Sequence, residues 1–442
     1  MKKTIQHNTN KALSYLSQVI EYRLNSVYGD AKLALPDPLK IKEISFLSFL
    51  KDRQFGETET VILLLALVPH ISPNFFNAII SKYLPKGGEF PEFGGVKGKN
   101  HRGILPTGET AQFILGGMDV VERMKLTALL KEESPLVKDG ILSLQSVPEG
   151  EPQMSGKLIL SQDYVDYFLT GERSKPKFGP EFPAREITTE LEWDDLVLSE
   201  NVKEQIDELR IWIAHNDVLM NGWKMSKKLK PGYRALFYGA SGTGKTLTAT
   251  LLGKYTGKPV FRVDLSTVVS KYIGETEKNL ERLFQKARNR DWILFFDEAD
   301  AIFGKRTGVK DAHDRYANQE VSYLLQRVED FEGLVIMSSN FKANIDDAFL
   351  RRFNAIIKFP FPNKNEREKI AKKSFPEHVK FEKKTDIPAL IGNYELSGGN
   401  IINVVQYACL KSISKKSKQI FKDDVLNGIK REVEKEGKVF SS

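Results

Sequence analysis

The stretch GASGTGKT at residues 239–246 has residue types and a spacing that could bind phosphate. It fits the pattern Gly-x-x-x-x-Gly-Lys-Thr and directly follows an apolar run, RALFYG, which predicts a buried strand. A strand that enters a glycine-rich loop before a helix turns backbone N–H groups towards a polyphosphate, whereas a chance lysine in a flexible loop would lack this flanking. Lys245 would reach the outer phosphates of a nucleotide, and the Thr246 hydroxyl would hold Mg²⁺. The residues predicted to contact the nucleotide are Gly239, Ala240, Ser241, Gly242, Thr243, Gly244, Lys245, Thr246 and Leu247.

Two adjacent acids, Asp297 and Glu298, end a second apolar run, WILFFDE. Neighbouring carboxylates at the end of a buried strand repel each other and lose hydration, unless a cation or a reaction requires them. We expect Asp297 to join the magnesium shell and Glu298 to be the base that deprotonates an attacking water. A helix N-cap beside a surface acid is the alternative. Asn340 ends the run LVIMSS and would hold the same water or the γ-phosphate, with a turn asparagine as its alternative.

Five apolar runs in the second half of the chain predict fully buried strands, and helical segments separate most of them. The alternation of strands and helices is typical of a parallel sheet with crossover helices, in which ligands bind at the carboxyl ends of the strands. Gly239, Asp297 and Asn340 stand at such ends, so we expect them to meet at one edge of the sheet. The runs are RALFYG at 234–239, PVFRVD at 259–264, WILFFD at 292–297, LVIMSS at 334–339 and AIIKFP at 355–360.

The composition limits the class of protein. The chain has 442 residues, which favours more than one domain, and its longest apolar run, VILLLALV at 61–68, is too short to span a bilayer. The single cysteine, Cys409, excludes an internal disulfide, and the histidines have no metal-ligand spacing. No apolar stretch follows the basic start, so we expect no secretory signal and a cytoplasmic location.

The formal net charge is +8, and its distribution argues against nucleic acid as a partner. Residues 1–190 carry 23 Lys and Arg residues against 23 Asp and Glu residues, so the excess lies in the half that contains the phosphate-binding pattern. A DNA-binding protein normally concentrates its basic charge on the domain that docks. The lysine-rich KSISKKSK at 411–418 is typical of a solvated helix face.

Four motifs share one order and spacing with a known family. GASGTGKT, FFDEAD at 295–300, SSN at 338–340 and FLRRF at 349–353 together resemble the AAA family of ATPases, nearest to its katanin- and spastin-like members. The resemblance covers about residues 190–430. It implies an α/β P-loop AAA+ module with a five-stranded parallel sheet and a small helical lid. It also implies ATP and Mg²⁺ as ligands, ATP hydrolysis as the reaction, and a homo-oligomeric, hexameric ring.

The resemblance assigns roles to two further segments. Arg351 and Arg352 match arginines that act on the ATP of the next subunit, where they stabilise transition-state charge. A salt-bridged surface pair is the alternative. The segment KYIGETEKN resembles the first pore loop of the family, so Tyr272 and Ile273 would grip an extended polypeptide while Gly274 lets the loop bend.

The stretch LSGGN at 396–400 looks like the LSGGQ signature of ABC transporter ATPases, but here it follows the acidic strand instead of preceding it. Its position resembles the start of the AAA lid helix. Asn400 stands where many relatives carry an acid, and the chain has no convincing sensor arginine. We therefore assign no catalytic residue to the lid.

The N-terminal half carries patterns from which no chemistry can be derived. Helical stretches precede two short β-like runs, ILSLQSV at 141–147 and KLILS at 157–161, and this order suggests a winged-helix-like unit in a mostly helical region. The segments FPEFGGVKGKNHRGILPTGETA at 90–111 and WDDLVLSENVKEQI at 193–206 resemble AAA ATPases encoded with extracellular contractile injection systems, which are phage-tail-like particles. That resemblance implies a role in particle assembly or cargo loading.

Two functions of different classes remain open at this point. The first is a ring-forming ATPase that remodels, unfolds or threads a protein client through a central pore, without a membrane or nucleic acid partner. The second is a nucleotide-gated scaffold or DNA-associated factor, in which a winged helix binds duplex and the ATP cycle switches assembly. The expected domains are an N-terminal helical region (1–84), a winged-helix-like domain (85–172), a Pro-rich linker (173–190), a large nucleotide-binding subdomain (191–362) and a small helical lid subdomain (363–442).

Overall fold

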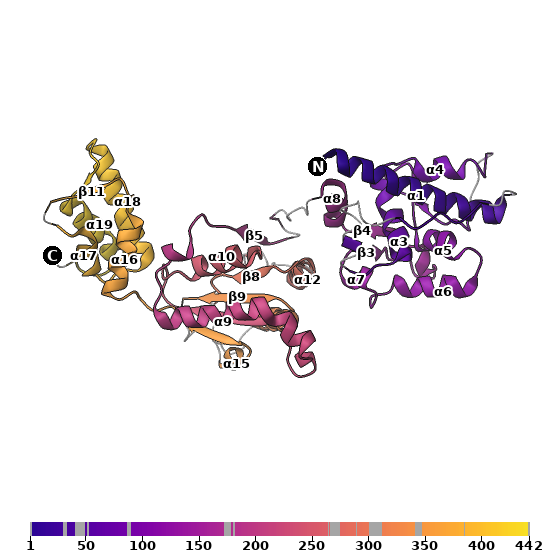
Figure 1. Cartoon of the computed structure of the whole chain (residues 1–442). Helices are drawn as coiled ribbons and strands as arrows, with labels where there is room; N and C mark the ends of the chain where they lie inside the picture. Colours follow the sequence, from indigo (N-terminus) through magenta and orange to yellow (C-terminus); the bar gives the residue numbers. More distant parts are fainter. Residues whose placement is uncertain are drawn as a thin grey trace. The chain divides into compact units, whose positions relative to one another are not determined.

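The fold is taken from a computed structural model of the chain, drawn in Figure 1. Contacts between residues divide the chain into two compact units, residues 1–176 and residues 177–442. The structure describes residues 2–29, 33–39, 49–50, 53–85, 90–171, 178–179, 182–263, 265, 275–288, 290–299, 312–340, 347–383 and 385–440.

The second unit contains a six-stranded sheet with the strand order β10-β6-β9-β8-β7-β5. The first five strands in this order are parallel to one another, and β5 pairs antiparallel with β7. The five apolar runs of the sequence form the parallel part. The strands are β5 (Ala184–Ile187), β6 (Tyr233–Tyr238), β7 (Val260–Val263), β8 (Ile293–Phe296), β9 (Leu334–Ser339) and β10 (Ala355–Lys358).

Strand β5 lies inside the stretch that the sequence predicts to be a linker. Phe182, just before β5, is buried against the rings of Phe261 and Trp292, with ring centroids 5.5 and 5.7 Å away. A buried aromatic ring removes about 150–250 Å² from water, which helps to fix a short strand at the edge of a sheet. The Pro- and Gly-rich composition indicates extended backbone but gives no sign of the pairing with β7. Residues 184–187 therefore belong to the sheet.

The two faces of the sheet carry separate hydrophobic cores, because successive side chains of a strand point to opposite faces. Phe295 of β8 belongs to the core beneath α9 and α10, and its neighbour Phe296 belongs to the core beneath α12 and α14. The sheet is thus covered on both sides, as parallel sheets require. The helices around the sheet are η4 (Trp193–Asp195), α9 (Glu200–Asp217), η5 (Val218–Gly222), η6 (Met225–Lys227), α10 (Lys245–Thr256), α12 (Glu275–Arg288), α14 (Ala312–Asp330) and α15 (Asp347–Leu350).

The register of the parallel strands brings three strand ends to one edge of the sheet. Tyr238 of β6 pairs with Ser339 of β9, and Phe296 of β8 pairs with Met337 of β9. The residues that follow these strands, among them Gly239, therefore leave the sheet at nearly the same level. This edge is where ligands bind in parallel α/β sheets.

The last part of the second unit, described over residues 363–383 and 385–440, is mainly helical and has its own core, which includes Ile401, Val404 and Ile429. Asn363 caps its first helix by accepting a hydrogen bond from the backbone N–H of Glu366 at 3.0 Å. We call this part the lid. Its elements are α16 (Lys364–Ser374), β11 (Lys380–Phe381), α17 (Ile387–Gly392), α18 (Gly398–Ser414), β12 (Gln419–Ile420) and α19 (Lys422–Lys435), with β11 and β12 parallel.

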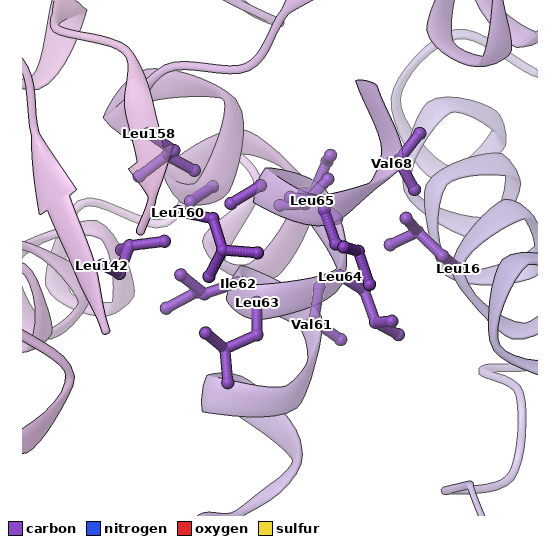
Figure 2. Packing of buried hydrophobic residues seen from close by; sticks show 14 of the residues in the cluster. Leu16, Val61, Ile62, Leu63, Leu64, Leu65, Val68, Leu142, Leu158 and Leu160 are labelled. Carbon is purple, nitrogen blue, oxygen red and sulfur yellow. The ribbon is translucent and has the colours of Figure 1, made fainter. Parts of the chain in front are cut away.

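The first unit packs around α3, whose side chains are buried from Thr60 to Leu67. Figure 2 shows α3 between Leu16 of α1 and the leucines of the antiparallel strands β3 and β4. The first unit is thus mostly helical with a small antiparallel strand pair. The assignment of a winged-helix unit stays a prediction. The elements are α1 (Lys2–Tyr28), α3 (Glu57–Leu67), η2 (Val68–His70), α4 (Phe75–Ile80), β1 (Val96–Lys97), β2 (Ile104–Leu105), α5 (Gly108–Gly116), α6 (Val120–Leu129), α7 (Pro135–Lys138), β3 (Leu142–Leu144), η3 (Gln153–Ser155), β4 (Leu158–Leu160) and α8 (Gln162–Thr170).

A helix that spans a bilayer needs about 20 predominantly apolar residues. No helix in the described part of the chain is both long enough and apolar enough. The apolar run at 61–68 falls in α3 and η2, and it is buried in the core of the first unit.

Candidate nucleotide-binding site

The phosphate loop, residues 239–246, connects β6 to α10 as the sequence predicts. Gly244 caps α10 with φ 99°, a left-handed backbone conformation in which a residue with a Cβ is strained. The loop therefore needs glycine at this position to turn directly into the first helical residue. The N-terminus of α10 and the backbone of the loop face the edge of the sheet where ligands bind, which suits a bound anion.

Lys245 is the first residue of α10, and only 7% of its surface is exposed. Its ammonium donates hydrogen bonds to the carbonyl oxygens of Gly239 at 2.6 Å and Ala240 at 3.0 Å. It also donates to Oδ1 of Asn340 at 3.2 Å, which joins the phosphate loop to the end of β9. A buried ammonium needs such oxygen partners, and phosphate oxygens could replace them because they carry more negative charge.

Asp297 and Glu298 follow β8 directly, beside the phosphate loop. Oδ1 of Asp297 accepts the backbone N–H of Glu298 at 3.1 Å, and Oδ2 lies 3.4 Å from Nη2 of Arg262. Glu298 has φ 51°, a left-handed conformation that costs a non-glycine residue about 1 kcal/mol or more. The strained turn thus holds the exposed carboxylate of Glu298 at the edge of the sheet where the parallel strands end.

A cavity of about 600 Å³ collects most of the residues predicted to contact the nucleotide, and its volume is in the range of small-ligand sites. Gly239 and Ala240 are not among its lining residues. Thr246 and Asp297 are both among its lining residues, and hydroxyl and carboxylate oxygens suit Mg²⁺. The predicted residues on its wall are Ser241, Gly242, Thr243, Gly244, Lys245, Thr246, Leu247, Asp297, Glu298 and Asn340. Further walls come from Leu191, residues 195–199, Val202, residues 359–360, Pro362, and the lid residues Glu366, Ile370, Lys373, Ser374, Gly398, Gly399 and Ile402.

The lid contacts the phosphate loop through backbone atoms. The N–H of Gly399, in the first turn of α18, donates to the carbonyl of Gly242 at 3.1 Å. Gly242 has φ 75°, and a Cβ at this position would lie 2.7 Å from the Ser397 hydroxyl and 3.0 Å from the nitrogen of Gly399. The absence of a side chain at Gly242 therefore allows the lid helix to approach the loop.

Asn400 supports the lid itself. Its Oδ1 accepts the N–H of Ser397 at 3.1 Å, and its amide donates to Oε2 of the buried Glu432 at 3.1 Å. Burial would raise the pKa of Glu432, but hydrogen bonds from Asn403, Lys435 and Asn400 together outweigh burial and leave that pKa below its ordinary value. Asn400 thus helps to keep a buried carboxylate ionised between α18 and α19.

Arg351 and Arg352 lie at the opposite edge of the sheet, in the turn between α15 and the start of β10. Both side chains are exposed, and both line a second cavity of about 470 Å³ rather than the one at the phosphate loop. Nη1 of Arg352 forms an ion pair with Oε1 of Glu329 at 3.1 Å, and Lys230 contacts the same carboxylate at 2.8 Å. The arginines therefore do not reach the site of their own subunit.

The predicted pore residues Tyr272, Ile273 and Gly274 lie outside the described residues, between β7 and α12. Their role stays a prediction. The structure adds one feature to the site that motif reasoning missed, which is Arg262. It could have been noticed as a charged residue within the apolar run PVFRVD. The contact of Gly399 with Gly242 involves the LSGGN stretch, whose position resembles the start of the AAA lid helix, where small residues let the helix approach the nucleotide.

The strand order, the loop between β6 and α10, and the acidic pair after β8 define a P-loop nucleotide-binding module of the α/β class. Residues 235–361 match the family model described as "ATPase family associated with various cellular activities (AAA)". This part of the chain is therefore an AAA domain.

Curated proteins similar to the chain agree with this assignment. An uncharacterized AAA family ATPase, y4kL, from Sinorhizobium fredii is 32% identical over 190 residues, which cover 42% of this chain and 55% of that protein. A cell division cycle protein 48 homolog from Archaeoglobus fulgidus is 26% identical, over 80% of this chain and 51% of its own length. A 26S proteasome regulatory subunit 6B homolog from Dictyostelium discoideum is 31% identical, over 47% of this chain and 53% of its own length. The chain thus matches about half the length of these relatives, and the similarity supports ATP hydrolysis.

We expect Lys245→Ala to weaken ATP binding by about ten- to a hundredfold, because a charge-assisted hydrogen bond contributes roughly 1.5–3 kcal/mol. Titration of a fluorescent ATP analogue in the presence of Mg²⁺ measures this affinity. Lys258→Ala is the matched control, because Lys258 lies beyond the other end of α10 and pairs with Asp291 at 3.1 Å. Equal ATP affinities for the wild type and Lys245→Ala would show that Lys245 does not bind the nucleotide.

Proposed function

We propose that this protein is an AAA+ ATPase that binds ATP in the cavity at the phosphate loop and hydrolyses it. The observation that carries the proposal is the convergence of Lys245, Thr246, Asp297, Glu298 and Asn340 on that one cavity. The matching family and the named relatives support the same activity.

In the proposed reaction, the oxygen of a water molecule forms a bond to the γ-phosphorus while the bond from that phosphorus to the bridging oxygen of ADP breaks. Lys245 neutralises charge on the outer phosphates, and Glu298 accepts a proton from the water. Asn340 orients the water or the γ-phosphate through its amide. Thr246 and Asp297 would hold Mg²⁺, which supplies positive charge to the phosphate oxygens.

We propose that the ATPase works as a homo-oligomeric ring, with a hexamer as the expected size. Arg351 and Arg352 lie at the edge of the sheet opposite to the cavity, so they would act only on the nucleotide of a neighbouring subunit. The phosphate loop of one subunit and the arginines of the next would then form one complete site.

We propose that the work done with ATP is the unfolding, remodelling or threading of a protein client through the ring. Tyr272, Ile273 and Gly274 would contact the client in the pore, because an aromatic and an aliphatic side chain can grip many sequences. The similarity to a cell division cycle protein 48 homolog and to a proteasome regulatory subunit supports this choice.

The sequence of residues 90–111 supports a finer proposal. From its resemblance to ATPases encoded with contractile injection systems, we propose a role in the assembly or cargo loading of such a particle, in the cytoplasm. The client would then be a particle component or a cargo protein captured with the help of the first unit.

The experiment that tests this function is the capture of the client by a ring that cannot hydrolyse ATP. Tagged Glu298→Gln protein is expected to retain the client in ATP and to release it in ADP, as measured by mass spectrometry of the bound fraction. Adding Tyr272→Ala in the same background should lower capture severalfold, because the apolar grip is lost, whereas Tyr272→Phe should preserve it. Equal capture by all three proteins would contradict the pore model, and an ATP affinity measured for each variant controls for loss of the nucleotide site.

A further inference from the structure

Arg262 contacts the acidic pair of the nucleotide site from a neighbouring strand. It is the third residue of β7, and its side chain is 51% exposed in an otherwise buried strand. Its Nη2 lies 3.4 Å from Oδ2 of Asp297, and Oδ1 of the same carboxylate accepts the N–H of Glu298. Both oxygens of the candidate magnesium ligand are therefore engaged by groups of this chain.

The position of Arg262 is costly for an arginine. The residue directly opposite on β5 is Arg185, and like charges in a cross-strand pair are destabilising. Arg185 places its guanidinium 3.9 Å from the centre of the Phe178 ring. Arg262 instead pairs with the acid of the site. The positive charge of Arg262, which faces that of Arg185, is thus compensated by the carboxylate of Asp297.

We propose that Arg262 is a positioning residue that neutralises Asp297 while the site lacks a metal ion and yields the carboxylate when Mg²⁺ arrives with ATP. The proposal rests on the function proposed above. The arginine of this ion pair is half-exposed, so the pair contributes only modestly and a divalent cation can displace it. Without Arg262, the bare carboxylate would repel the phosphates of a metal-free nucleotide and would be more available to Mg²⁺.

The experiment compares the affinity of a fluorescent ATP analogue in EDTA with its affinity in Mg²⁺, for the wild type and for Arg262→Gln. We divide the dissociation constant in EDTA by the dissociation constant in Mg²⁺. We expect this ratio to rise by about two- to fivefold in Arg262→Gln, which is the range for a partly exposed ion pair. Arg262→Lys keeps the positive charge and should return the ratio towards the wild-type value. Arg262→Met preserves the aliphatic length and serves as a second uncharged variant if Arg262→Gln does not fold.

Arg185→Gln is the matched control, because it removes the same charge from the facing residue without touching Asp297. The proposal is overturned by an unchanged ratio in Arg262→Gln, or by an equal shift in Arg185→Gln. It is also overturned if Arg262→Gln weakens binding equally with and without Mg²⁺, since Arg262 would then contact the phosphates themselves. Failure of the wild type to bind the analogue in Mg²⁺ would instead contradict the proposed function.

Discussion

Glu298→Gln is expected to bind ATP with nearly wild-type affinity and to hydrolyse it at least about a hundredfold more slowly. Glutamine has the shape of glutamate but cannot accept the proton of the attacking water. Glu298 lies on the wall of the cavity with Lys245 and Asn340, and it is exposed to the solvent from which that water comes. ATP binding depends mainly on the phosphate loop, so the rate of hydrolysis should fall while the affinity for ATP stays nearly the same.

Phosphate release measures the hydrolysis, and titration of a fluorescent ATP analogue measures the binding. Glu332→Gln is the matched control, since Glu332 is an exposed acid that pairs with Arg288 at 3.9 Å before β9 begins. It should retain full activity. Normal turnover by Glu298→Gln would show that another group takes the proton.

Arg351→Ala is expected to lower ATP hydrolysis by about a thousandfold, and mixing it with Lys245→Ala subunits should restore part of the activity. At an interface between the two variants, the intact phosphate loop of one subunit receives Arg351 from its neighbour. Arg351 is the better choice for this test than Arg352, because removal of Arg352 would also leave Glu329 without one of its two cationic partners. A loss of stability would then obscure the loss of activity.

The phosphate release of mixtures at several ratios measures the rescue, and it should reach a maximum at intermediate ratios. Arg288→Ala removes another exposed arginine and should leave hydrolysis unchanged. If no ratio restores activity, the site is not shared between subunits, and the arginines are a surface pair.

Buried features of the second unit could be predicted from the sequence because local patterns determine them. The runs that became β6, β8 and β9 are continuously apolar, and Gly239, Asp297 and Asn340 follow them, so the edge of the parallel sheet could be predicted as the site. Gly244 is likewise required by the backbone of the loop itself. These predictions need no knowledge of distant contacts.

Other features depend on contacts between distant residues and could not be predicted. Strand β5 is held by Phe182 against Phe261 and Trp292, which lie far along the chain. The ion pair of Arg262 with Asp297 depends on the order of β7 and β8 in the sheet and on the direction of both side chains. The role of Asn400 depends on Glu432, which lies on another helix and accepts a hydrogen bond from its amide.

The hydrogen bond from Gly399 to Gly242 joins two backbones, so it transmits position without depending on any side chain. Gly399 belongs to α18, and α18 also supplies Ile401 and Val404 to the core of the lid. A displacement of the phosphate loop by a ligand would therefore reach the first turn of α18 and, through that helix, the core of the lid.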